Sequence, residues 1–211
     1  MFIQSNTLIL LCDVEDTLVQ GTFADNLLQN AELDPAEFWN DLFRQDQGPH
    51  PDIPLFYTEL LARIGPNLTR NQLSSVGKTQ ALMPGLPDGF VHLQEVASHT
   101  PADLQIWFVT CGFSEVVDAT PLARFSHKVI GTIGDFDRSD RLVGVSHAVT
   151  PEQKGELIDS IVASLADSGV VNPGSRVCFL GDGLTDAFGF RRARAHGGEA
   201  VRVSQRPLLL D

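Results

Sequence analysis

The chain has 211 residues, of which 43% are hydrophobic and 20% are charged, and this is typical of a folded globular protein with one sizeable core. Its formal net charge of -12 argues against a sequence-independent grip on nucleic acid or on an anionic membrane, because both need clustered Lys and Arg. Any phosphate that it binds must therefore be held by a local site.

The N-terminal segment MFIQSNTLILL has no basic start and no small-residue cleavage pattern. Its apolar part is too short to span a bilayer. We therefore expect a cytoplasmic protein with no membrane and no nucleic acid among its partners.

The first predicted strand, residues 7–12, is a continuous apolar run, as in a parallel sheet that is covered on both faces. It is followed by Asp13, Glu15 and Asp16. Crowded carboxylates raise one another's pKa unless a cation neutralises them, so such a cluster is costly without a purpose. A magnesium ion would supply that purpose, because it prefers carboxylate oxygens and often binds together with a substrate phosphate.

Residues 20–100 consist of amphipathic segments separated by Pro, Gly and Asn, with little β-alternation. We predict that they form a helical cap inserted after the first strand, which leaves residues 1–19 and 101–211 as the catalytic core. The spacing of the aromatic residues favours a small core of the cap over a substrate pocket; they are Phe38, Trp39, Phe43, Phe56 and Tyr57. Arg44 and Arg63 would either meet an acidic substrate group or lie on the surface.

Two further apolar runs, residues 104–109 and 176–180, end at the turns TCG and GDG. Between the strands lie helical segments, of which residues 150–169 are the clearest, with Thr150 and Gln153 as a capping box. Residues 127–145 predict two short strands around a polar turn. The pattern predicts an α/β fold with a doubly wound, Rossmann-like parallel sheet that binds ligands beyond the carboxyl ends of its strands.

The second acid pair, Asp182 and Asp186, follows the strand over residues 176–180, with glycines that allow the backbone to approach an ion closely. Two acid clusters at the mouth of one parallel sheet predict a magnesium site.

A phosphoryl group at that site needs further positive charge and hydrogen-bond donors. Thr110, Cys111 and Gly112 offer a hydroxyl and backbone N–H groups at a helix start, which favours anions. Lys154 adds a full positive charge. A nucleophile, a metal and donors around the phosphoryl oxygens are the parts that phosphoryl transfer needs.

Four segments, CDVEDTLV, FVTCGF, the lysine in TPEQKGEL and FLGDGLTDA, resemble in sequence order the motifs of the haloacid dehalogenase-like hydrolase superfamily. The phosphoserine-phosphatase-like branch is the most similar, and it carries its cap where this chain has its helical insertion. The resemblance covers residues 7–19 and 104–203. It implies a magnesium-dependent phosphatase, a phosphoric monoester hydrolase that acts on a small phosphorylated metabolite.

The resemblance also implies the roles of single residues. Asp13 would attack phosphorus to form an aspartyl-phosphate, and Glu15 would protonate the leaving oxygen and then activate water. The metal ligands would be Asp13, Glu15 through its backbone carbonyl, Asp182 and Asp186, the last through water or by orienting Lys154. The phosphoryl oxygens would be bound by Thr110, Cys111, Gly112 and Lys154.

The chain departs from the family pattern where it has Glu15 followed by Asp16, because the family usually has Asp followed by Gly. Thr185 stands where Asn is usual. The longer Glu15 leaves open a second function, that of a catalytically slow regulatory module that binds magnesium and phosphate. A receiver domain also places acids, a Thr and a Lys around magnesium, but its order of motifs and its lack of a helical insertion fit this chain poorly.

Overall fold

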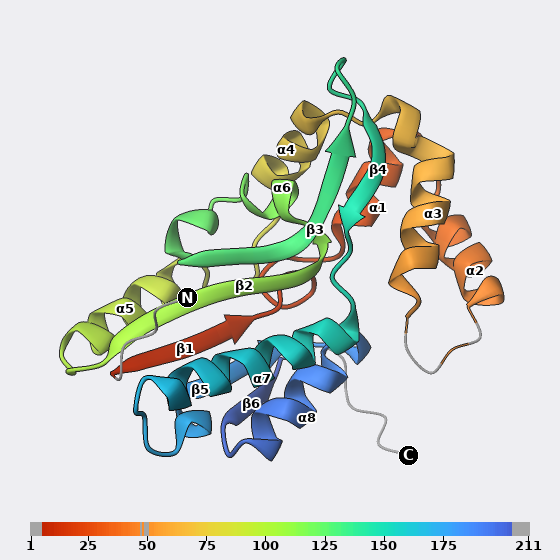
Figure 1. Cartoon of the computed structure of the whole chain (residues 1–211). Helices are drawn as coiled ribbons and strands as arrows, with labels where there is room; N and C mark the ends of the chain where they lie inside the picture. Colours follow the sequence, from red (N-terminus) through yellow and green to blue (C-terminus); the bar gives the residue numbers. More distant parts are fainter. Residues whose placement is uncertain (1–5, 47, 49–50, 204–211) are drawn as a thin grey trace.

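The computed structural model describes residues 6–46, 48 and 51–203. Residues 1–5 of the N-terminal segment and residues 204–211 of the predicted core lie outside this part. Within it, six strands form one sheet in the order β4-β3-β2-β1-β5-β6 (Figure 1). The strands are β1 (Thr7–Cys12), β2 (Asp103–Phe113), β3 (Lys128–Phe136), β4 (Leu142–His147), β5 (Val177–Gly181) and β6 (Glu199–Arg202).

The sheet is parallel except for β4, which pairs antiparallel with β3. β1 lies at its centre: Leu10 pairs with Ile106 of β2 on one side and with Cys178 of β5 on the other. The chain therefore winds outward from β1 in both directions, and the carboxyl end of β1 is the switch point at which such sheets bind ligands. The predicted doubly wound α/β fold is confirmed.

Helices cover both faces of this sheet (Figure 1). On β2, Trp107 and Val109 pack with α7 and α8, whereas Ile106 and Phe108 face the opposite layer. This alternation is the two-residue period of a strand that is buried on both faces. The helices are α1 (Phe23–Asn30), α2 (Pro35–Gln45), α3 (Ile53–Ile64), α4 (Arg70–Thr79), α5 (Asp88–Ser98), α6 (Ser114–Val117), α7 (Pro151–Asp167) and α8 (Ala187–Ala195).

The local signals that predicted α7 and the β3/β4 hairpin are present in the structure. Thr150 accepts from the backbone of Gln153 while the Gln153 side chain reaches back, which completes the capping box. After α7, Gly169 adopts φ +86°, a conformation that glycine takes without steric cost. The strand predicted over residues 104–109 continues further, through the TCG turn to Phe113, so the helix α6 begins later than expected.

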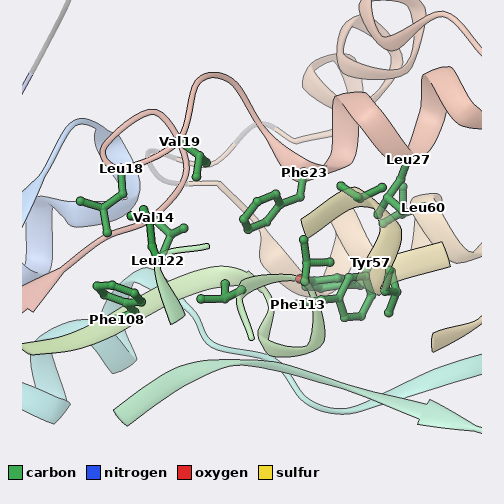
Figure 2. Close-up of a cluster of buried hydrophobic side chains, with 14 of the residues drawn as sticks. Val14, Leu18, Val19, Phe23, Leu27, Tyr57, Leu60, Phe108, Phe113 and Leu122 are labelled. Atoms are coloured by element: carbon green, nitrogen blue, oxygen red, sulfur yellow. The ribbon is translucent and has the colours of Figure 1, made fainter. Parts of the chain in front are cut away.

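Helices α1 to α4 follow β1 and contribute to one continuous core with the sheet. Figure 2 shows part of it, with Tyr57 and Leu60 of α3 near Phe113 at the end of β2. α5 lies inside the range predicted as cap, residues 20–100, yet its Phe90 packs on Phe108 of β2, with ring centroids 5.8 Å apart. The division into cap and core remains a prediction. Among the described residues, no helix combines the length and apolarity needed to cross a membrane.

Candidate active site

Lys154 of α7 lies at the centre of the site, fully buried between two carboxylates. Its Nζ is 2.7 Å from Oδ1 of Asp13, which follows β1, and 2.7 Å from Oδ1 of Asp186, which follows β5. The other oxygen of Asp13 accepts a hydrogen bond from Thr17 Oγ1 at 3.1 Å. The other oxygen of Asp186 accepts from the backbone N–H groups of Asp182 and Gly183, at 3.0 and 3.2 Å, so both carboxylates are oriented by donors to each oxygen.

Burial shapes the protonation of this cluster. It raises the pKa of Asp13 to about 8, and the Lys154 ammonium opposes that rise. Burial also acts to lower the pKa of Lys154, but Asp13 and Asp186 outweigh it and hold that pKa well above its usual value. Burial raises the pKa of Asp182 to about 6, with Asp186 adding to the rise. The cluster carries more acid than its single ammonium compensates.

Three of the predicted metal ligands come together. Asp13, Asp182 and Asp186 each offer a carboxylate oxygen, and these oxygens lie within 4.8 Å of one another. Hard oxygen donors of this kind are those that Mg²⁺ prefers, so the residues fit the expected ion. The Glu15 carboxylate is not part of this group. The part of Glu15 expected to bind metal is its backbone carbonyl, and that role remains a prediction.

The side chain of Glu15 points toward α1. Its Oε1 accepts from the backbone N–H of Phe23 at 2.7 Å, and its Oε2 is 3.4 Å from Thr110 Oγ1. Burial raises the pKa of Glu15 to about 7, against the lowering effect of the Phe23 hydrogen bond. Gly112 makes room for it, because a Cβ at that position would lie 2.9 Å from Glu15 Oε2.

Asp16 explains the second departure from the family pattern. Its φ is 55°, in the left-handed region that favours glycine and that Asp and Asn tolerate better than most residues. Its Oδ1 accepts from the backbone of Gly21 at 3.0 Å, which stabilises the turn. The turn shape is therefore kept without the glycine.

Thr110, Cys111 and Gly112 form the second wall of the site, in the last residues of β2. Thr110 is completely buried, and its Oγ1 accepts from the Gly112 N–H at 2.9 Å. The Cys111 carbonyl accepts from Tyr57 Oη at 2.6 Å and from Thr132 Oγ1 at 2.8 Å. Thr110 and Gly112 thus lie beside Glu15, and the helix expected to start at these residues begins at Ser114. Their binding of phosphoryl oxygens remains a prediction.

A cavity of about 290 Å³ opens above the acids. The segments that follow β1 and β5 contribute Asp13, Glu15 and Asp182 to its lining, and helices α1 to α3 contribute mostly apolar side chains. Of the aromatic residues weighed above, four line it and Phe38 does not. Against the expectation of a small core, Trp39, Phe43 and Phe56 therefore line the cavity, whereas Phe38 is core and the buried Tyr57 belongs to both. Arg63 and Arg44 instead bond to Asp41, at 2.9 and 3.3 Å.

Several contributors are not predicted by the sequence reasoning above. Thr17 lies four residues after Asp13, and a buried hydroxyl at that spacing is a signal that could have been used. Tyr57 is considered above only as an aromatic residue, and its hydrogen bond to the Cys111 carbonyl has no local pattern, because the two residues are 54 positions apart. Gly181 leaves space for the Asp186 carboxylate, with which a side chain at 181 would collide.

The chain matches no family model and no curated protein by sequence. Solved structures are similar. A HAD-family hydrolase from Salmonella enterica serovar Typhi aligns with a TM-score of 0.69 and 13% identity, over 90% of this chain and 60% of that one. A phosphoserine phosphatase from T. onnurineus aligns with a TM-score of 0.63 and 17% identity, over 99% of this chain and 89% of that one. A phosphoserine phosphatase solved as a phospho-aspartyl intermediate analogue aligns with a TM-score of 0.63 and 16% identity, over 89% of this chain and 83% of that one.

The chain thus spans 60% of the length of the Salmonella hydrolase and most of the length of the two phosphatases. At these identities the similarity concerns the arrangement of strands and helices. The chain has the fold of the haloacid dehalogenase-like hydrolases, in the form found in phosphoserine phosphatases.

Proposed function

We propose that this protein is a magnesium-dependent phosphatase that hydrolyses a small phosphate monoester through an aspartyl-phosphate on Asp13. One observation carries the proposal: Asp13 lies at the switch point of the sheet, 2.7 Å from the buried Lys154, beside two further acids and open to a cavity. A salt bridge with only a structural role would need neither the additional carboxylates nor an opening to a cavity.

The ion would be held by Asp13, Asp182 and Asp186, whose oxygens fit Mg²⁺. When bound, it supplies positive charge that neutralises the phosphoryl oxygens and the acid cluster. Lys154 adds its own charge to that of the ion, and its two short contacts fix the ammonium in place. The N–H groups of Cys111 and Gly112 and the hydroxyl of Thr110 are the remaining candidates to hold phosphoryl oxygens, and the Gly112 N–H would exchange its present bond to Thr110 Oγ1 for one to the phosphoryl group.

The chemistry assigned to the side chains consists of two displacements. A carboxylate oxygen of Asp13 forms a bond to phosphorus while the bond to the ester oxygen breaks, and Glu15 gives its proton to that leaving oxygen. A water molecule then attacks the aspartyl-phosphate and transfers a proton to Glu15, which releases inorganic phosphate and restores both carboxyl groups. The Phe23 N–H and Thr110 hold the Glu15 carboxyl beside the cavity in which the ester would lie.

The cavity volume suits a small molecule, near the lower end of the range of about 300–1,000 Å³ for ligand sites. A small phosphorylated metabolite is therefore the proposed substrate. The acidic net charge is in keeping with a protein that holds neither nucleic acid nor an anionic membrane, and we propose a cytoplasmic location.

The test is the release of inorganic phosphate from a panel of small phosphate esters, with and without Mg²⁺. Wild type is compared with Asp13→Asn and with Asp135→Asn, an exposed acid of β3 outside the cavity lining. We expect magnesium-dependent release that is lost in Asp13→Asn and kept in Asp135→Asn. No release from any ester by the wild type would favour the slow regulatory module that the longer Glu15 leaves open.

A further inference from the structure

The cavity also carries information on the leaving group. We infer that the alcohol or phenol esterified to the phosphate is apolar, with an aromatic ring or a short aliphatic chain, and that it bears no carboxylate. This inference rests on the proposed function for the phosphate end and on the cavity lining for the other end.

A row of aromatic rings lines the cavity from its entrance to its floor. Phe43 stacks on Trp39 with ring centroids 6.0 Å apart, and Trp39 stacks on Phe56 at 5.5 Å with an interplanar angle of 10°. Phe56 meets Tyr57 edge to face at 4.8 Å, and Tyr57 meets Phe113 at 5.0 Å. Flat rings held by such contacts favour another ring or a hydrocarbon chain as their partner.

The polar end of Trp39 is already engaged, because its Nε1 donates to Asp25 at 2.7 Å. The hydroxyl of Tyr57 is likewise bonded to the Cys111 carbonyl. These two side chains therefore present ring surface to the cavity, and their strongest donors point elsewhere. A polar leaving group would lose its contacts with water here and regain few of them.

The charged side chains along the cavity are all acids. Besides those of the site, Asp16, Asp46 and Asp52 line it, and no Lys, Arg or His is found among the described lining residues. The nearby Arg63 is held by Asp41 and lies over the ring of Phe38, outside the lining. A carboxylate on the substrate would face like charges with no described cation to receive it, which is strongly unfavourable.

Two of the apolar side chains that line the cavity are also largely exposed. Phe43 of α2 is 60% exposed, and Leu184, two residues after Asp182, is 68% exposed. Large apolar side chains left in water at the mouth of a cavity mark a surface that a ligand covers. Phe43 and Leu184 come from two different parts of the chain, so an apolar leaving group would contact side chains from both.

The kinetic test uses two esters that share a substituted phenol as leaving group. 4-Methylphenyl phosphate is neutral beyond its phosphate, whereas 4-(carboxymethyl)phenyl phosphate adds a carboxylate, and no ammonium that the acids of the lining would attract, to the same ring. We expect kcat/KM to be at least about tenfold higher for 4-methylphenyl phosphate, because like charges are rejected in a site of this kind. Equal or faster hydrolysis of 4-(carboxymethyl)phenyl phosphate would overturn the inference and leave the phosphatase proposal standing.

A binding measurement separates the two proposals. Benzylphosphonate and 4-carboxybenzylphosphonate are not hydrolysed, and each is titrated in the presence of Mg²⁺ while tryptophan fluorescence is followed. Trp39 lines the cavity and the second tryptophan, Trp107, is buried against α7, so a change upon binding reports on Trp39. We expect benzylphosphonate to bind at least about tenfold more tightly. That result without turnover of any ester would reject the phosphatase and keep the ligand class, whereas equal binding or none would reject the ligand class.

A variant tests the lining itself. Phe43→Arg places a cation at the entrance on a side chain that is already exposed, so the fold should tolerate it. It should reduce the preference for the neutral ester by raising its KM and lowering that for 4-(carboxymethyl)phenyl phosphate. Val171→Arg, which adds the same charge at an 84% exposed position outside the cavity lining, should leave the preference unchanged. An equal shift in both variants would mean that net charge, and not the lining, sets the preference.

Discussion

Glu15 and Asp16 are the two residues at which the chain departs from the first of the four motifs that it resembles, and each departure has a local physical reason. The longer Glu15 reaches the backbone N–H of Phe23, and it fits because Gly112 has no side chain to meet it. Asp16 holds the left-handed turn with a hydrogen bond to Gly21. The glutamate side chain therefore fits its surroundings, and this favours the proposal that it acts as the general acid over the alternative that it is a defect.

This explanation predicts that restoring the usual aspartate does harm. Glu15→Asp shortens the side chain by one methylene. The Phe23 N–H then loses its acceptor, and the carboxyl group lies farther from Thr110. A displacement of about 1 Å can cost about a hundredfold in rate. We therefore expect kcat/KM to fall by about that factor in steady-state assays with the best ester of the panel.

The matched control is Asp16→Gly, which restores the other usual residue one position later. Glycine adopts the φ of 55° freely, so this variant should keep kcat/KM near that of the wild type. A Glu15→Asp protein faster than the wild type would show instead that the glutamate is a defect and would support the slow regulatory module.

At the residue scale, the sequence predicts side chains that follow a strand and belong to an ordered set of motifs. Asp13, Lys154 and Asp186 come from three distant segments, and their order along the chain was enough to place them together. The hydrogen bonds of Thr17 to Asp13 and of Tyr57 to Cys111 were not predicted, because single hydroxyls are common and their partners depend on the final packing.

At the scale of elements, the sheet was easier to predict than the helical insertion. β1, β2 and β5 are buried on both faces, so their apolar runs are continuous and their ends are marked by polar turns. β6 at the sheet edge is mostly exposed and has no such run. The sequence does not predict which elements α1 to α4 pack against. Amphipathic periodicity shows which face of a helix is buried, but it does not identify the partner of that face.

Tyr57 joins α3 to the wall of the site, and the contact allows a prediction. Tyr57→Phe removes the hydrogen bond to the Cys111 carbonyl, but Thr132 still donates to that carbonyl, so no buried acceptor is left without a donor. We expect a loss of about 0.5–1.5 kcal/mol in the free energy of unfolding, measured with urea. We also expect a lower kcat/KM, because Cys111 and Gly112 lose a restraint beside the phosphoryl site.

Thr58→Val serves as the comparison for Tyr57→Phe. It removes a hydroxyl from the next residue of α3, one that is exposed and bonds only locally to the Pro54 carbonyl. Its activity should match that of the wild type. If Tyr57→Phe lowers stability and leaves activity untouched, the contact holds the elements together without ordering the site.

In the molecule as a whole, repulsion between like charges opposes folding. The chain has 27 acidic and 15 basic side chains, and at the centre of the sheet the Lys154 ammonium serves Asp13 and Asp186, with Asp182 close by. Excess charge of one sign destabilises a compact state through self-repulsion. A divalent cation at this point would remove the repulsion where burial makes it strongest, so the folded state should bind the ion and the unfolded chain should not.

Magnesium should therefore stabilise the protein without any substrate. At about a hundred times its Kd, an ion that binds only the folded state adds about 2.7 kcal/mol, which for a chain of this size raises Tm by about 5–10 °C. Calorimetry with MgCl₂ against NaCl of equal ionic strength measures this shift, and EDTA should reverse it. Asp182→Asn should lose most of the shift, whereas Asp135→Asn, at an exposed position in β3, should keep it. An equal shift in both variants would assign the stabilisation to general screening of the net charge and would count against a magnesium site at the end of β1.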